Sequence, residues 1–253
     1  MEKRRYMLKL PIFFILALCL STIGCGNKTP INQIPMYGNV PPTPQEQEAH
    51  DRFIKEVIEG AGSREAAIKQ SLALAWSYYN KKDFETAMKR FNQTWLLDHN
   101  NADVYWGFGL LLRERGQHNE ALKMYDKALE INPDMPEVYN NRGNLYKDKR
   151  QDEQALADFA KAIELKPDFF MPYANRGLLY FNKKEYEKAL VDFNHAIEIE
   201  PKDAQSYNDR GCTYFFMKQY DKAWDDVHKA QELGYPVHPM FLKDLKKASG
   251  REG

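Results

Sequence analysis

Residues 139–146 (YNNRGNLY), 173–180 (YANRGLLY) and 207–214 (YNDRGCTY) decide the fold of this chain. They recur at a spacing of 34 residues and share an opening Tyr, a central Arg–Gly pair and a closing Tyr. A period of about 20 to 50 residues is typical of repeat architectures, in which each unit buries its apolar face against its neighbours. The chain is therefore expected to be an array of similar units.

Extended in both directions, the period covers residues 68–237 in five units: 68–101, 102–135, 136–169, 170–203 and 204–237. Small residues recur inside the units. Position 8 is Ala75, Gly109, Gly143, Gly177 and Gly211, and position 20 is Ala87, Ala121, Ala155, Ala189 and Ala223. Large residues recur between them, mostly aromatic at positions 4, 11 and 24.

This pattern predicts two antiparallel helices in each unit. A glycine inside a helix costs about 1 kcal/mol relative to alanine, so its recurrence at position 8 requires a compensating interaction. Close approach of the two helices supplies it, with the aromatic residues filling the space beside the small ones. Pro133, Pro167 and Pro201 then end the second helix of three units.

The periodic Gly, Ala, Phe, Ala and Pro positions resemble the tetratricopeptide repeat family over residues 68–237. The resemblance implies an all-α, right-handed solenoid of antiparallel helix pairs. The outer units depart from the motif, at Ser71 and Ala75 in the first and at Val227 and Tyr235 in the last. Terminal repeats are usually atypical because one of their faces meets water or a cap. Residues 45–67 are expected to form an N-terminal helix and linker, and 238–253 a C-terminal capping helix and tail.

The resemblance also places the first helix of each unit on the concave face. Positions 2, 5, 6, 9, 12 and 13 would then line a groove that binds a partner protein or peptide. The expected groove residues are Trp76, Tyr79, Trp106, Leu110, Asn140, Asn141, Asn144, Asn175, Leu178, Phe181, Asn208, Asp209, Phe215 and Phe216. Amide side chains both donate and accept hydrogen bonds, as an extended peptide backbone requires.

Other readings of this surface remain open. The amide-rich strings are close to the family consensus, so they also fit a role in folding or solubility. The convex face, the loops and an exposed edge for dimerisation are alternative contact sites. Arg142, Arg176 and Arg210 at position 7 are expected to pack against neighbouring helices with their charges paired.

The N-terminus predicts export. Residues 2–9 are basic, and residues 10–20 (LPIFFILALCL) form an apolar run that is short for a bilayer span. Residues 1–24 are therefore expected to be a signal peptide, and STIGC resembles a bacterial lipobox that makes Cys25 the lipidated first residue. Plain cleavage and a retained anchor are the alternatives. Residues 25–44 contain five prolines, which predicts an extended tether, and Gly26 favours the outer over the inner membrane.

Composition and motifs exclude several other functions. Lys and Arg number 36 and Asp and Glu 36, so the chain lacks the excess of cations expected of a nucleic-acid-binding protein. No phosphate-binding loop, HExxH, paired CxxC or GxSxG occurs. His228 beside Asp225 and Asp226 is expected on a solvated helix face, and Cys212 is expected to be a packing residue. No catalytic site, metal or cofactor is predicted.

The chain is thus expected to be a non-enzymatic interaction scaffold or adaptor, lipid-anchored in the bacterial cell envelope and facing the periplasm or the surface. A self-associating structural module, or a secreted repeat protein without a lipid anchor, is the alternative.

Lipidation at Cys25 predicts that Cys25→Ser releases the protein from membranes, because no acyl chain can then be attached. Fractionation of cells expressing the two forms measures this. Persistent membrane association of the variant would instead indicate a retained apolar helix or a membrane-bound partner.

Overall fold

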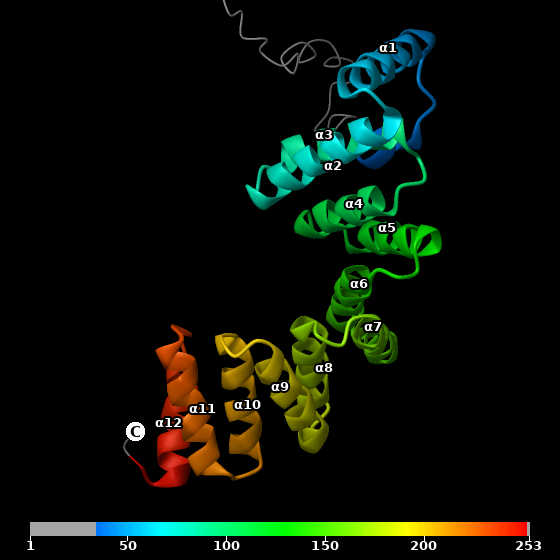
Figure 1. The fold of residues 1–253 in the computed structure, drawn as a ribbon. Coiled ribbons are helices and arrows are strands. Elements are labelled where there is room, and N and C mark those ends of the chain that lie inside the picture. The colour runs from blue at the N-terminus through cyan, green and yellow to red at the C-terminus, as the bar shows by residue number, and fades with distance from the viewer. Residues whose placement is uncertain (1–33, 252–253) are drawn as a thin grey trace, which may run out of the picture. The chain divides into compact units, whose positions relative to one another are not determined.

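The computed structural model describes residues 34–251, which form helices joined by short connections (Figure 1). They form twelve α-helices and one short 3-10 helix, and none of them lies in a β-strand. The predicted all-α class is therefore confirmed. The chain divides into two compact units after His99, with the first predicted repeat in one unit and the other four in the second. The predicted signal peptide and Cys25 lie outside the described residues.

The first unit holds the predicted leading helix and the first helix pair. Its elements are η2 (Pro35–Asn39), α1 (Pro44–Ala61), α2 (Arg64–Asn80) and α3 (Phe84–Leu97). Ser63 precedes α2, and its side chain accepts a hydrogen bond of 3.1 Å from the backbone N–H of Ala66. Ser63 thus caps α2.

Part of the expected tether is not extended. Residues 35–39 form η2, which packs against α3, and the Nδ2 of Asn92 donates a 2.9 Å hydrogen bond to the carbonyl of Ile34. Asn92 is fully buried on α3, where an amide without a partner would be costly. The carbonyl of Ile34 is that partner, so this segment belongs to the folded unit.

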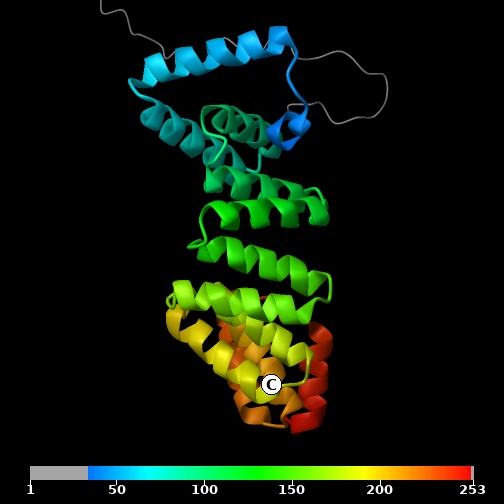
Figure 2. The ribbon, with the colours of Figure 1, turned by 90° about the vertical axis from the view of Figure 1, so that its right-hand side faces the viewer.

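The second unit consists of four helix pairs and a last single helix. The elements are α4 (Ala102–Glu114), α5 (His118–Ile131), α6 (Pro136–Asp148), α7 (Asp152–Leu165), α8 (Phe170–Asn182), α9 (Tyr186–Ile199), α10 (Ala204–Phe216), α11 (Tyr220–Glu232) and α12 (Pro239–Ser249). Each first helix packs mainly against the second helix of its own pair. The pairs α4/α5 and α6/α7 form successive layers, seen as green ribbons in Figure 2. Helices α5, α7 and α9 each end two residues before the proline of their unit.

The glycines at position 8 allow the helices of a pair to touch. A Cβ atom at Gly109 would lie 2.3 Å from Cε1 of Tyr125, and one at Gly143 would lie 2.8 Å from the ring of Phe159. Both rings are completely buried. The aromatic residue at position 24 therefore occupies the space that a side chain at position 8 would fill, which is a more direct contact than the sequence pattern predicts.

The turn inside each pair requires a left-handed residue. Position 15 has a positive φ in all five repeats, between 58° and 72°, at Lys82, Gly116, Arg150, Lys184 and Lys218. Four of these residues carry a side chain, although glycine adopts this conformation at lower cost. Four of the five turns therefore place an exposed basic side chain at the end of the first helix.

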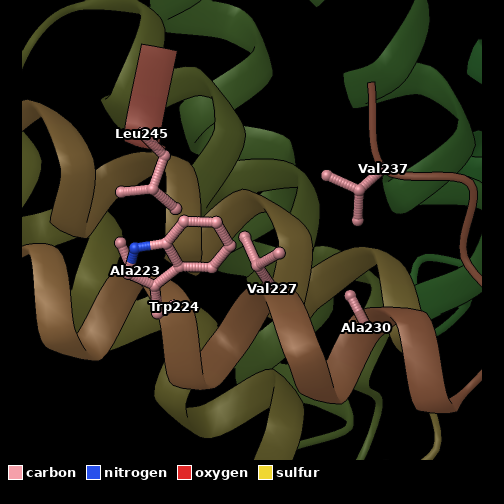
Figure 3. Packing of buried hydrophobic residues seen from close by; sticks show 6 residues of the cluster. All are labelled: Ala223, Trp224, Val227, Ala230, Val237 and Leu245. Carbon is pink, nitrogen blue, oxygen red and sulfur yellow. The ribbon is translucent and has the colours of Figure 1, made fainter. Parts of the chain in front are cut away.

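Helix α12 closes the second unit as the predicted cap. Leu245 is completely buried against Trp224, and Val237 completes the same cluster (Figure 3). The Nε1 of Trp224 donates a 3.1 Å hydrogen bond to the hydroxyl of Ser249. Met240 is 65% exposed. It lies in the first turn of α12, whose buried contact is made one turn later by Leu245.

Substituting Gly109 by alanine is expected to lower the free energy of unfolding by about 1–3 kcal/mol. The added methyl group overlaps the buried ring of Tyr125, and this outweighs the gain in helix propensity. The midpoint of urea unfolding measures the change.

Gly211→Ala is the matched control, because it occupies the same position and its added Cβ comes no closer than 3.2 Å to a neighbour. Its midpoint should shift by less than that of Gly109→Ala. An equal shift would mean that the contact with the aromatic ring does not explain the glycine.

Candidate functional site

The candidate site is the surface formed by the first helices of the second unit. Helix α8 contacts both α6 and α10, so these three helices lie side by side. We call the surface made by positions 2, 5, 6, 9, 12 and 13 of α4, α6, α8 and α10 the first-helix face. Twelve of the fourteen expected groove residues belong to it, and Trp76 and Tyr79 belong to the first unit.

The arginines at position 7 each pair with an aspartate of their own repeat, and Arg142 also pairs with Asp126 of the preceding repeat at 2.7 Å, so they are not free to bind a ligand. Arg142 makes two hydrogen bonds to Asp158, of 2.8 and 2.7 Å, and Arg210 makes two of the same lengths to Asp226. Arg176 binds Asp192 in the same way, with both distances 2.8 Å. The prediction that these arginines are packed with their charges paired is confirmed.

These ion pairs join the two helices of a pair, and the arginine in each provides the charged partner that the buried aspartate requires. Burial raises the pKa of Asp158 and of Asp226, although the paired guanidinium acts in the opposite direction. A buried carboxylate that lost its arginine would destabilise the fold strongly, so the pairs hold the helices in one register. Their atoms are directed into the helix pairs and leave the first-helix face to other residues.

The amides do not form one continuous ladder. The Nδ2 of Asn175 donates a 2.9 Å hydrogen bond to Oδ1 of Asn140, and Asn208 donates a 3.0 Å bond to Asp209. Asn140 is only 4% exposed and thus joins α6 to α8. Asn141 and Asn144 are half-buried and form no side-chain hydrogen bond to the described part of the chain. Their donors and acceptors are therefore open to a ligand.

Two expected groove residues are corrected by their burial. Leu110 is 5% exposed and Asn140 is 4% exposed, so neither lines an open surface. Trp106, Asn141, Asn144, Asn175, Leu178, Phe181, Asn208, Asp209 and Phe215 are half-buried, and Phe216 is exposed. In the first unit Trp76 packs edge-on against Phe91, with ring centres 5.0 Å apart, and Tyr79 lies 5.6 Å from Phe84.

Aromatic side chains concentrate at one end of α8 and α10. The ring of Phe216 stacks on Tyr186 at 5.8 Å and meets Phe181 at 5.5 Å. Phe216 is nevertheless 54% exposed, whereas Phe215 is partly covered by Phe241 of α12. Phe216 is thus the part of the cluster that a partner can cover.

Sequence reasoning missed Met171 and Tyr186. Met171 occupies position 2 of α8, which is among the positions predicted to line the groove, and it is 44% exposed. Tyr186 begins α9 and belongs to a second helix, so the rule based on first helices excluded it. The aromatic character of position 17 in the last two repeats was the signal available.

Asp209 is the sheltered carboxylate of this face. Burial raises its pKa, and Asp203 adds to the rise, while hydrogen bonds from Asn208 and Gln205 and the charge of Lys147 act against it. Lys147 belongs to α6, on the other side of α8, and its positive charge lowers the pKa of the Asp209 carboxylate. At the opposite end of the face, burial and then Glu137 raise the pKa of Asp103.

Cys212 and His228 are the reactive side chains that the sequence singled out. No group of three or more potential metal ligands occurs in this range. Burial raises the pKa of the Cys212 thiol to about 12, with a further contribution from Asp209, so the thiol stays protonated at neutral pH. His228 is exposed and lies beside Trp224, with ring centres 5.4 Å apart. Among the described helices, none is both long and apolar enough to cross a bilayer.

Comparison with known families identifies repeats in the second unit. Tetratricopeptide repeat models match residues 136–169, 172–203 and 193–225, and a TPR repeat model matches residues 109–149. None of these models describes an enzyme family. No curated protein matches the chain.

Solved structures share the fold at low sequence identity. One from the functional characterisation of Pseudomonas aeruginosa PilF is 18% identical, with a TM-score of 0.68, and the match covers 74% of this chain and 86% of that chain. PilW, described as a widely conserved type IV pilus biogenesis factor, is 18% identical, with a TM-score of 0.64 and coverage of 73% and 87%. YrrB, described as a TPR protein with an unusual peptide-binding site, is 23% identical, with a TM-score of 0.57 and coverage of 77% and 97%. At these identities the similarity establishes the fold alone.

Replacing Asp209 by asparagine is expected to raise the free energy of unfolding at pH 7. The pKa of Asp209 is raised in the folded chain, so its ionised form is disfavoured there relative to the unfolded chain. The gain should shrink as the pH falls through the raised folded pKa and disappear below about 3.9, the unfolded value. Urea unfolding between pH 3 and 8 measures this.

Asn141→Asp introduces the opposite change at the same position of an earlier repeat, and it is expected to lower stability at pH 7. If Asp209→Asn were less stable than the parent at neutral pH, the carboxylate would be a stabilising group and the argument from burial would be wrong.

Proposed function

We propose that this tetratricopeptide repeat protein is a non-enzymatic scaffold in the bacterial cell envelope that holds a partner protein or peptide on its first-helix face. The observation that carries the proposal is the exposed ring of Phe216 on the same surface as the open amides of Asn141 and Asn144. An aromatic side chain supplies buried area on binding, and amides supply directional hydrogen bonds.

The arrangement of the face supports a protein ligand. Its arginines are already engaged by aspartates, so the accessible groups are neutral amides, aromatic rings and a few charges at the ends of the helices. A peptide backbone presents alternating donors and acceptors, and amide side chains can match both. An anion bound through an arginine cluster would need several unpaired guanidinium groups, whereas Arg113 at position 12 of α4 is paired with Glu114 at 2.9 Å.

The unfavourable ionisation of Asp209 in the folded chain also supports a binding role for this face. A buried carboxylate with a raised pKa destabilises the folded chain at neutral pH, and proteins commonly retain such groups where function requires them. A donor from a bound partner would satisfy the carboxylate and recover part of this cost.

Two observations support a place in the envelope. The apolar run at residues 10–20 followed by Cys25 fits an exported, lipid-anchored chain. PilW, which shares the fold, is described as a widely conserved type IV pilus biogenesis factor. We infer that the chain likewise supports an assembly at the membrane, with the outer membrane favoured.

Crosslinking followed by affinity capture from native envelopes tests the proposal. The full chain is expected to capture a defined partner, and a double variant with Phe216→Ser and Asn144→Ser is expected to capture at least about tenfold less of it. Phe216 is largely exposed and Asn144 has no hydrogen-bonded partner among the described residues, so neither change should unfold the chain.

Val191→Ser is the matched control. Val191 is 56% exposed on α9, outside the first-helix face. Capture that is equal for the double variant and the parent would reject this face as the binding site. Loss of capture in the Val191 variant instead would place the contact on the second helices.

A further inference from the structure

Helix α8 carries an apolar row along the first-helix face. Met171, Ala174, Leu178 and Phe181 follow one another at intervals of three, four and three residues. Met171 is 44% exposed and the other three side chains are half-buried. Intervals of three and four residues place all four on one side of a helix, and this is the spacing by which two helices pack along a shared seam.

Polar side chains flank this row along most of its length. Helix α6 presents Asn141 and Asn144, and α10 presents Asn208 and Asp209 before the aromatic Phe216 at its C-terminal end. The apolar row is therefore a single helix wide, and at about 1.5 Å per residue it extends for roughly 15 Å. Its apolar width suits one amphipathic helix better than a broad apolar surface of a globular partner.

The two ends of the face carry opposite charge. The four residues that lead into each first helix are 100–103, 134–137, 168–171 and 202–205, and together they contain five acidic residues and one basic residue. The last four positions of each first-helix segment are 113–116, 147–150, 181–184 and 215–218, and together they contain eight basic residues and two acidic ones. The face thus runs from acidic at the N-terminal ends of its helices to basic at their C-terminal ends.

The ion pairs within the chain do not neutralise the charge at either end of the face. At the acidic end Asp103 lies close enough to Glu137 to be influenced by its charge. Glu137 has a cationic partner, Lys166 at 3.1 Å, whereas Asp103 has none among residues 34–251. At the basic end Lys183 lies 3.8 Å from Glu153, while Lys147 and Lys218 have no ion pair within the described part of the chain. Uncompensated charge of each sign therefore remains at the matching end.

We propose that the occupant of this face is an amphipathic α-helix of a partner protein, which runs antiparallel to α8 with an acidic N-terminal end over Lys147, Lys183 and Lys218. This inference rests on the proposed function and specifies its partner. The apolar residues of the bound helix pack on the row from Met171 to Phe181 and against Phe216. Its basic C-terminal end lies over Asp103 and Glu137.

The antiparallel direction follows from electrostatics. Acidic residues stabilise the N-terminus of a helix and basic residues its C-terminus, so an ordinary stable helix has the charge order that this direction requires. In the parallel direction the same helix would place like charges together at both ends. Antiparallel packing also makes the dipole of the bound helix antiparallel to the dipole of α8, so that opposite partial charges lie side by side.

A pair of hydrocarbon-stapled peptides of 15 residues tests the direction. Both have leucines at intervals of three, four and three residues; one has glutamates in its first turn and lysines in its last turn, and the other has these charges exchanged. The staple keeps both helical, which circular dichroism verifies. Fluorescence anisotropy with the full chain is expected to give at least tenfold tighter binding for the acidic-first peptide, and the difference should narrow as salt is raised.

Substitutions in the protein locate the peptide. Met171→Glu is expected to weaken binding of the acidic-first peptide at least tenfold, and Val191→Glu, a change of the same kind at an exposed valine on α9, should leave it unchanged. Lys147→Glu together with Lys218→Glu should reduce or reverse the preference between the two peptides.

Each contrary result has a defined meaning. Equal affinity for the two peptides, or tighter binding of the charge-exchanged one, overturns the direction. Absence of binding by both peptides overturns the helical occupant while leaving capture of a native partner in place, so the two failures are distinguishable. A chain whose mass rises with concentration in sedimentation, and whose Met171→Glu variant stays monomeric, would mean that a second copy covers the row, and this also overturns the proposal.

Discussion

The second unit depends on the close approach of the glycine at position 8 to the residue at position 24 in each helix pair, which is an aromatic ring in three pairs and Val227 in the last. The ring at position 24 occupies the volume where a Cβ at position 8 would lie, closest at Gly109 and Tyr125 and nearly as close at Gly143 and Phe159. Two helices can approach this closely only where one of them lacks a side chain. The contact brings the backbones together and thereby determines which residues of each first helix remain on the surface.

Charged residues provide a second contact between the two helices of a pair. The Arg–Asp pairs of the last three repeats join the same two helices one position away from the glycine and from the residue at position 24. In the repeat at residues 102–135 the same two positions are Phe108 and Met124, so an apolar pair stands where the others have an ion pair. Burial is costly for the ions, and the geometry of two hydrogen bonds compensates by allowing only one register. The arginines at position 7 are engaged in these ion pairs. The first-helix face therefore presents amides, aromatic rings and the charges at the helix ends.

The surface that results differs from the rest of the molecule in its chemistry. Met171 and Phe216 are exposed apolar residues on α8 and α10, and Asp209 is a carboxylate held where its ionised form is disfavoured. None of these features improves the stability of an isolated chain. Exposed apolar residues and sheltered charges are typical of surfaces that another protein covers.

The sequence by itself determined the period, the helix pairs and the small residues between them, because a repeat of 34 residues imposes the same packing on every unit. It also determined that the arginines at position 7 would be paired. Only the tertiary structure decided which neighbouring amide is accessible: Asn140 is bound to Asn175 of the next repeat, whereas Asn141 stays open. It likewise decided that residues 35–39 fold against α3, since a contact between Ile34 and Asn92 joins positions far apart in the chain. Periodicity encodes contacts that recur at fixed separations, and these contacts occur once.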